Sequence, residues 1–293
     1  MPSVSLADRA LIRVSGPDAE HFLQNIVTAD LSDLPERAAK PCALLTPQGK
    51  ILFDFLIARD GADTFLIDCR ADVADDLSRR LMLYRLRAKA EISKLDQTPV
   101  TIEWDSDSSR SGTDSSPSES DSTQAFRDLR FVEPAVWRRH GGAAGADTPE
   151  DWDLLRIENG VVESGSDYQL SDAFPHDVLL DQNGGVGFRK GCYVGQEVVS
   201  RMQHRGTARR RVLVTHGDKP LPAPGTEITA NGRAIGSLGT VAGERALAIV
   251  RIDRVKDAID AGVPILAGET EVTLTIPPHA RFTFPQDAST GAD

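Results

Sequence analysis

The amino-acid sequence predicts an α+β protein that ends in a small β-domain. Two observations support this prediction. Residues 1–205 mix segments of helical and strand periodicity, whereas short apolar runs separated by Gly and Pro fill residues 206–285. A chain of 293 residues, 40% of them hydrophobic, is also long enough for two or three domains, each with its own core.

The N-terminal region is expected to begin with a helix. Ser15 is a candidate cap, Pro17 falls near the first turn, and apolar residues recur at helical spacing between positions 22 and 27. The elements expected next are a β-hairpin of residues 43–46 and 51–58 across the Pro47-Gln48-Gly49-Lys50 turn, a strand at 64–69, and helices at 71–86 and 151–158.

A Ser/Asp-rich segment, residues 105–123, interrupts this pattern. It holds nine serines and five acidic residues, so it has almost no apolar area to bury and is predicted to be flexible. The flanking residues 100–104 and 125–130 have strand character. We therefore interpret the segment as an insertion in a hairpin.

The last third of the chain has the pattern of a small β-barrel. Asn231-Gly232 is a strong hairpin signal between two short apolar runs. Residues 286–293 are expected to form a disordered tail. The predicted strands are residues 211–216, 226–230, 234–241, 247–252, 271–276 and 281–284.

Composition excludes several classes of protein. A net charge of −11 argues against a DNA-coating role, and no apolar run is long enough to span a membrane. The three cysteines, Cys42, Cys69 and Cys192, include no CxxC pair, so no metal site is expected. These features, with no signal-peptide pattern, predict a reduced, cytoplasmic protein, and we expect a monomer.

The most informative segment is Lys190-Gly191-Cys192-Tyr193-Val194-Gly195-Gln196-Glu197. Cys192 lies between Lys190 and Arg201, and cationic neighbours favour the reactive thiolate. Gly195 permits backbone conformations that other residues avoid, and Gln196 and Glu197 are placed to open a helix. The alternative interpretation is a Gly-rich turn around a buried, inert cysteine.

A basic strip surrounds this segment. Residues 187–213 contain seven basic residues and one acidic residue, within an acidic protein. Such a strip suits an anionic small molecule, or, through Arg209-Arg210-Arg211, an RNA or a client protein. A strand or loop whose cations pair with acidic neighbours remains the alternative.

Further candidates lie outside this segment. Asp54 sits in an apolar strand, where a carboxylate needs a partner; it could accept the paired N–H donors of a pterin, or pair with a buried arginine or a turn. Tyr84 is either core or a stacking surface. Arg156 and Glu158 are either pocket residues or a helix end. His176 adjoins Asp177, but without a GxSxG elbow a hydrolase has little support.

The segment 190–197 resembles the folate-binding YgfZ group of the aminomethyltransferase (glycine-cleavage T-protein) superfamily. Weaker resemblances to that superfamily cover residues 16–31, 46–54, 84–87, 156–160 and 174–177. The resemblance implies two intertwined α+β domains and a C-terminal β-barrel around a central cavity for tetrahydrofolate.

It also implies function. The YgfZ group supports iron–sulfur client proteins, including radical enzymes that modify tRNA, with Cys192 as the key thiol. In the aminomethyltransferases an aspartate matching Asp54 is catalytic, so a one-carbon transferase is the alternative, and a non-catalytic scaffold is the third. Residues expected at the folate are Asp54, Tyr84, Arg156, Glu158, Lys190, Gly195, Gln196, Glu197 and Arg201.

Overall fold

The computed structural model describes residues 1–95, 98–105, 125–141, 145 and 148–285. The chain divides into two compact units. Unit 1 comprises Met1–Trp152 with Asn183–Ser200, and unit 2 comprises Asp153–Gln182 with Arg201–Asp293. Apart from Asp105, the predicted insertion at 105–123 lies outside the described residues, as does the predicted tail at 286–293.

Unit 1 is built on a nine-stranded mixed sheet in the order β1-β7-β9-β8-β3-β4-β5-β2-β6. Strands β3 and β8 are parallel, and the other neighbours are antiparallel. The strands are β1 (Ser3–Leu6), β2 (Arg9–Ser15), β3 (Ala38–Leu45), β4 (Ile51–Arg59), β5 (Thr64–Arg70), β6 (Glu91–Leu95), β7 (Val100–Trp104), β8 (Ala125–Asp128) and β9 (Val136–His140).

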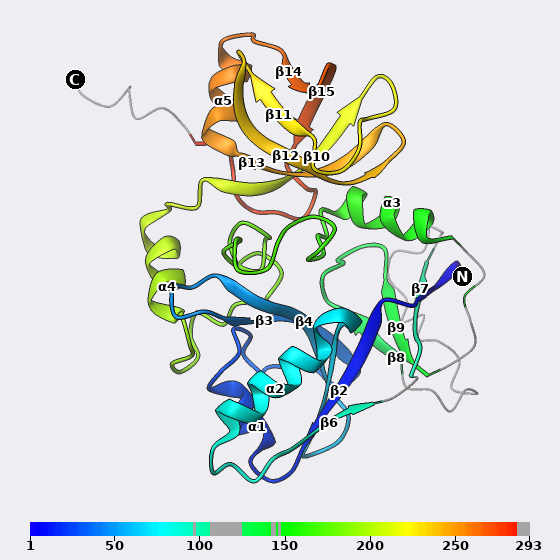
Figure 1. The fold of residues 1–293 in the computed structure, drawn as a ribbon, viewed down its shortest axis with the longest axis vertical. Helices are drawn as coiled ribbons and strands as arrows, with labels where there is room; N and C mark the ends of the chain where they lie inside the picture. Colours follow the sequence, from blue (N-terminus) through cyan, green and yellow to red (C-terminus); the bar gives the residue numbers. More distant parts are fainter. Residues whose placement is uncertain (96–97, 106–124, 142–144, 146–147, 286–293) are drawn as a thin grey trace. The chain divides into compact units, whose positions relative to one another are not determined.

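Two helices belong to this sheet, α1 (Ala19–Gln24) and α2 (Ala74–Arg85), which follows a short 3-10 turn, η1 (Ala71–Val73). Helix α2 buries Leu77 and Leu81 and packs against β2 and β6 (Figure 1). The predicted Ser15 cap is wrong. Ser15 is the last residue of β2 and pairs with Thr64 of β5. The residue before α1 is Asp18, whose carboxylate accepts a hydrogen bond from the Lys89 N–H and does not cap the helix.

The predicted hairpin of residues 100–104 with 125–130 is also wrong. Strands β7 and β8 are not neighbours, because β9 lies between them and pairs with both. The sequence of β9 contains Arg138-Arg139-His140, which hid it from a search for apolar alternation. The structure places Arg138 in the core, where it is fully buried.

Unit 2 contains a closed six-stranded barrel, β10-β13-β12-β11-β14-β15 (Figure 1). Strand β10 closes it by pairing with both β13 and β15. The hairpin at Asn231-Gly232 is confirmed, with both residues at positive φ between β11 and β12. The strands are β10 (Arg210–Gly217), β11 (Glu227–Ala230), β12 (Arg233–Ala242), β13 (Arg245–Arg251), β14 (Ile265–Ala267) and β15 (Thr270–Thr275).

The remaining helices are α3 (Pro149–Asn159), α4 (Gln196–Arg205) and α5 (Ile252–Asp260). The α+β class with a C-terminal barrel is therefore confirmed. The predicted strand at 281–284 is wrong, because these residues form no strand. Phe282 and Phe284 instead pack their side chains against the barrel core, with Phe282 5.0 Å from the Arg211 guanidinium. No helix in the described residues is long and apolar enough to cross a membrane.

Candidate functional site around the Cys192 loop

We call residues 190–195 the Cys192 loop. Its approach is fixed to unit 1 by Thr28. The buried Thr28 hydroxyl donates to the Gly185 carbonyl (2.7 Å) and accepts from the Ala43 N–H (2.9 Å). The Thr28 carbonyl accepts from the Gly187 N–H at 2.8 Å. These bonds tie the approach to strand β3, so it holds one path without regular secondary structure.

Lys190 anchors the loop itself. Its ammonium donates to the carbonyls of Val27 (2.7 Å) and Ala29 (2.8 Å) and lies 5.3 Å from the centre of the Tyr193 ring. Burial lowers the pKa of Lys190 to about 8. These contacts direct the Lys190 ammonium at backbone carbonyls. That Lys190 and Arg201 favour a Cys192 thiolate stays a prediction.

The far end of the loop lies against the β3–β4 turn. Gly195 has φ +80°, and a Cβ there would lie 2.5 Å from the Thr46 carbonyl oxygen. Gly49, in the turn, has φ +81°, and its Cβ would lie 2.8 Å from Val198. Only glycine allows both backbones to come this close. The Pro/Gly turn predicted from the sequence is thus part of the seat of the loop.

Helix α4 begins at Gln196, directly after the loop, as predicted. Glu197 is exposed in its first turn, Gln196 is half-buried, and Val199 is buried. The loop is therefore held at its approach by Thr28, in the middle by Lys190 and at its end by Gly195 and α4.

Cys192 is exposed, in contrast to Cys42 and Cys69. Burial raises the pKa of both other thiols, that of Cys69 to about 12. Phe188, with 37% of its surface exposed, lies close by in sequence. The alternative interpretation of a buried cysteine is wrong, and the structure presents one accessible thiol on a fixed loop.

Asp54 is linked to the approach of the Cys192 loop through strand pairing. It is half-buried in β4 directly opposite Ala43 of β3, and the Ala43 N–H is the one that binds Thr28. The predicted alternation holds at Phe53 and Phe55, which are buried on either side of it. Unit 1 thus brings together Asp54, Thr28 and the approach to the Cys192 loop. Tyr84 is half-buried near the end of α2.

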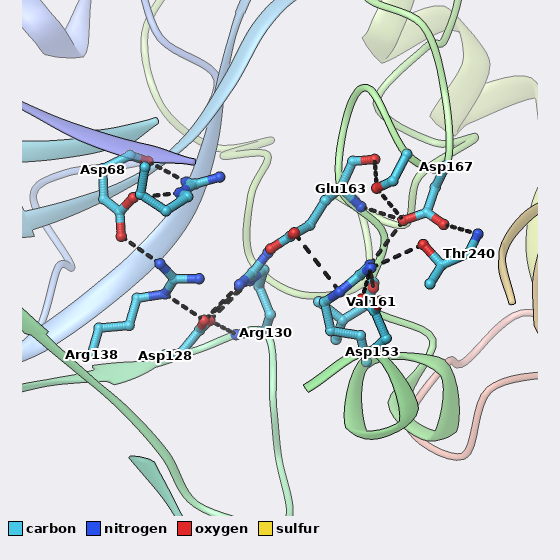
Figure 2. A network of polar contacts seen from close by, with 12 residues as sticks. Asp68, Asp128, Arg130, Arg138, Asp153, Val161, Glu163, Asp167 and Thr240 are labelled. Carbon is cyan, nitrogen blue, oxygen red and sulfur yellow. Dashed lines mark hydrogen bonds and ion pairs between the residues drawn. The ribbon is translucent and has the colours of Figure 1, made fainter. Parts of the chain in front are cut away.

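Arg156 belongs to unit 2, where both terminal nitrogens of its guanidinium donate hydrogen bonds and its Nε lies 3.8 Å from the Glu163 carboxylate. Its guanidinium donates to Asp167 (2.9 Å), Asp153 (2.7 Å) and Thr240 (2.9 Å), and it is 2% exposed (Figure 2). Burial opposes its charge, but the carboxylates of Glu163, Asp167 and Asp153 raise the pKa of Arg156 above its ordinary value. This is a structural network that connects α3 to the barrel strand β12.

Two more predicted site residues lie in unit 2. Glu158 is exposed and pairs with Arg245. Arg201 is exposed on α4. Their side chains and that of Arg156 belong to a different unit from Cys192 and Asp54.

Three arginines of the basic strip are paired with acidic residues within unit 2. Arg211 is buried and donates to Asp181 (2.7 Å) and to the His176 carbonyl (2.7 Å). Arg210 lies 3.3 Å from Asp172, and Arg209 lies 3.9 Å from Asp253. The alternative of a strand paired with acidic neighbours therefore describes residues 209–211 better than a free docking strip.

His176 is buried and contacts Gln203, Nε2 to Oε1 at 3.1 Å. Burial lowers the pKa of His176, so the neutral imidazole is favoured. The ring is thus part of the packing between α4 and the segment before it.

The sequence did not reveal a second buried network, which lies in unit 1. Arg138 donates to Asp68 and, at 2.9 Å, to Asp128, while Arg9 reaches Asp68 at 2.7 Å (Figure 2). Burial would raise the pKa of Asp68, but Arg138 and Arg9 hold it well below its usual range. The sequence signal that could have revealed this network is Asp68, a carboxylate in the apolar strand predicted at 64–69. Thr28 was likewise not singled out as a site residue.

The described residues contain no group of three His, Cys, Asp or Glu side chains that could hold a metal ion.

Two domain families match the chain. Residues 5–104 match the GCVT N-terminal domain, and residues 209–282 match the C-terminal beta-barrel domain of CAF17. A crystal structure of the glycine cleavage system aminomethyltransferase T from Bartonella henselae is similar over 95% of this chain and 86% of its own, with a TM-score of 0.67 and 15% identity. This likeness establishes the aminomethyltransferase-like fold.

Sequence relatives are more specific. An iron–sulfur cluster assembly factor IBA57 homolog from Pyricularia oryzae is 32% identical over 92% of this chain and 78% of its own length. One from Chaetomium globosum is 34% identical over 71% of this chain, which spans about half (54%) of that relative.

The cytoplasmic localisation predicted from the sequence is wrong by this comparison, because both relatives are named mitochondrial proteins. Three unpaired cysteines indicate a reducing compartment but do not say which one. The fold, the two domain matches and the sequence relatives agree with one another, and the chain belongs to the family of IBA57 iron–sulfur cluster assembly factors within the aminomethyltransferase-like superfamily.

Proposed function

We propose that this chain is an accessory protein for the assembly or repair of iron–sulfur enzymes and that Cys192 is its working thiol. One observation carries the proposal: Cys192 is exposed on a loop fixed by Thr28, Lys190 and Gly195. A fixed loop presents the thiol in one position, which suits transfer or ligation between molecules. The YgfZ-type role, with [4Fe–4S] enzymes that modify tRNA among its clients, is part of this proposal.

The chemistry follows from one accessible thiol. Thiolates are the protein ligands that iron–sulfur clusters use. A single thiolate does not enclose a cluster, so Cys192 would act together with ligands from a client or carrier protein. The protein would then hold the cluster only in passing and would not keep it as a resident cofactor.

Replacing Cys192 by Ser tests this role in cells that lack the protein. We expect the wild-type chain, but not Cys192→Ser, to restore the activity of a [4Fe–4S] enzyme, because Ser keeps the size of the side chain and removes the thiolate. Gly191→Ala is the matched control: a Cβ at Gly191 has no atom within 4 Å. Full restoration by Cys192→Ser, at equal protein levels, would reject a thiol role.

We further propose that unit 1 binds tetrahydrofolate through Asp54. A half-buried carboxylate on an apolar strand can accept two N–H donors from the amino-pyrimidine edge of the pterin. Tetrahydrofolate would supply a one-carbon carrier. Arg156 and Glu158 fit this ligand poorly, because their side chains are engaged in pairs within unit 2.

Calorimetric titration with tetrahydrofolate tests this site. We expect Asp54→Asn to weaken binding about 10- to 100-fold, because it removes a charge-assisted acceptor. Glu158→Gln, on the exposed Arg245 pair, should bind like the wild type. Equal binding by the wild type and Asp54→Asn would place the folate elsewhere.

The alternative, a one-carbon transferase, is favoured by one feature, the retained Asp54 in the hairpin strand of an aminomethyltransferase-like fold. A transferase would need the Asp54 carboxylate and not the Cys192 thiol. Methylene-tetrahydrofolate would form from an aminomethyl donor with Cys192→Ser but not with Asp54→Asn.

A further inference from the structure

An apolar patch is left exposed at the C-terminal end of helix α2 in unit 1. Met82, Leu83 and Leu86 are 49%, 68% and 85% exposed. Leu86 follows Leu83 and Met82 by three and four residues, the spacings at which side chains adjoin on a helix, whereas Leu77 and Leu81 of α2 are buried. These three residues, which we call the Leu86 patch, therefore add nothing to the core described above.

The backbone at Leu86 is strained. Its φ of 47° and ψ of −104° are close to those of the first central residue of a type II′ turn, and the Ala88 N–H closes the turn onto the Arg85 carbonyl at 2.8 Å. Glycine is the residue that occupies this position without strain. A leucine held there and 85% exposed gains no burial in return. Strain of this kind points to a role outside the fold.

Cations surround the patch. Residues 79–89 contain Arg79, Arg80, Arg85, Arg87 and Lys89 and no acidic residue, although the chain carries a net charge of −11. Arg79 pairs with Asp76 one turn back, whereas Arg80, Arg87 and Lys89 are exposed. Arginines outnumber lysine, and their planar guanidinium groups match carboxylates in a bidentate manner.

We propose that the Leu86 patch and its arginines form a docking surface for an acidic iron–sulfur recipient protein, with Leu86 as the anchor in an apolar pocket of that partner. The class of partner rests on the proposed function. A protein pocket fits the observations better than a lipid surface, because one strongly exposed leucine held at a turn and flanked by planar guanidinium groups matches a shaped, carboxylate-bearing surface. Charge complementarity then steers an acidic partner toward this basic surface.

Leu86→Gly is the decisive variant, because the fold and the interface respond to it in opposite directions. Relief of the positive φ should raise Tm by about 2 °C. Loss of the anchor should weaken binding at least about 10-fold. Binding would be followed by fluorescence anisotropy with a purified, acidic [4Fe–4S] dehydratase in its apo form. Leu83→Ser should weaken binding as well, whereas Ile259→Ser, 52% exposed on α5 of unit 2, should not.

Unchanged affinity in Leu86→Gly, or no binding by the wild-type chain, would overturn the docking surface. Binding of the wild-type chain, but not of Leu86→Gly, to phosphatidylglycerol vesicles with unchanged dehydratase binding would assign the patch to a membrane instead. The Cys192→Ser test in cells reports separately on the proposed function. A positive Cys192 result with unchanged Leu86→Gly affinity would leave the proposed function standing and remove only this surface.

Discussion

Replacing Arg156 by Leu is expected to lower the free energy of unfolding by about 3–5 kcal/mol. The guanidinium is 2% exposed and binds Asp167, which is 1% exposed, together with Asp153 and Thr240. Leucine would leave the Asp167 carboxylate buried beside Glu163 with its main cation removed. Urea unfolding of the wild type and the variant measures the difference.

The exposed Glu158–Arg245 pair is the matched control for Arg156, because it lies in the same unit with both side chains nearly half exposed. Arg245→Leu should cost less than about 1 kcal/mol. Adding Asp167→Asn to Arg156→Leu should recover part of the loss, since the buried charge is then gone. A cost for Arg156→Leu no larger than that for Arg245→Leu would show that the network is not structural.

Gly195→Ala is expected to lower the free energy of unfolding by about 2–4 kcal/mol and to release the Cys192 loop from its seat. Alanine at φ +80° is strained, and its Cβ would meet the Thr46 carbonyl oxygen at 2.5 Å and the Gly49 Cα at 3.0 Å. Both contacts are backbone atoms, which cannot swing away as a side chain can. Urea unfolding gives the stability, and the rate of Cys192 alkylation reports on the loop.

Gly191→Ala is the control for Gly195→Ala, because it adds the same methyl group to the loop without a clash. It lies in the same loop, but open space surrounds its Cβ position, so a change within about 0.5 kcal/mol is expected. If Gly195→Ala were as stable as Gly191→Ala, with the same alkylation rate, the loop would not be seated on the β3–β4 turn.

Elements with clear periodicity could be predicted from the sequence. The hairpin around 47–50, helix α2 and most barrel strands follow from alternation, helical spacing and turn residues. Strand β9 could not be recognised, because its Arg138 is a core residue only once Asp68 and Asp128 from other strands are placed around it. Helix α5 was missed because the apolar end of β13 runs directly into its first residue, Ile252.

The candidate site could be predicted in part for the same reason. The chemistry of the Cys192 segment is local, so its glycines and thiol were recognisable. The role of Lys190 was not, because it depends on the carbonyls of Val27 and Ala29, which are distant in sequence. Arg156 was interpreted as a pocket residue since its partners, Asp167 and Thr240, come from other segments.

The central claim is tested most directly by repair of a [4Fe–4S] dehydratase in vitro. The oxidised dehydratase would be incubated with iron, sulfide, thiol reductant and either the wild-type chain or Cys192→Ser, and its activity and cluster absorbance followed. We expect the wild-type chain to accelerate recovery at least about 10-fold over Cys192→Ser, which should match the reaction without protein. Equal acceleration by both chains would contradict a working thiol at Cys192.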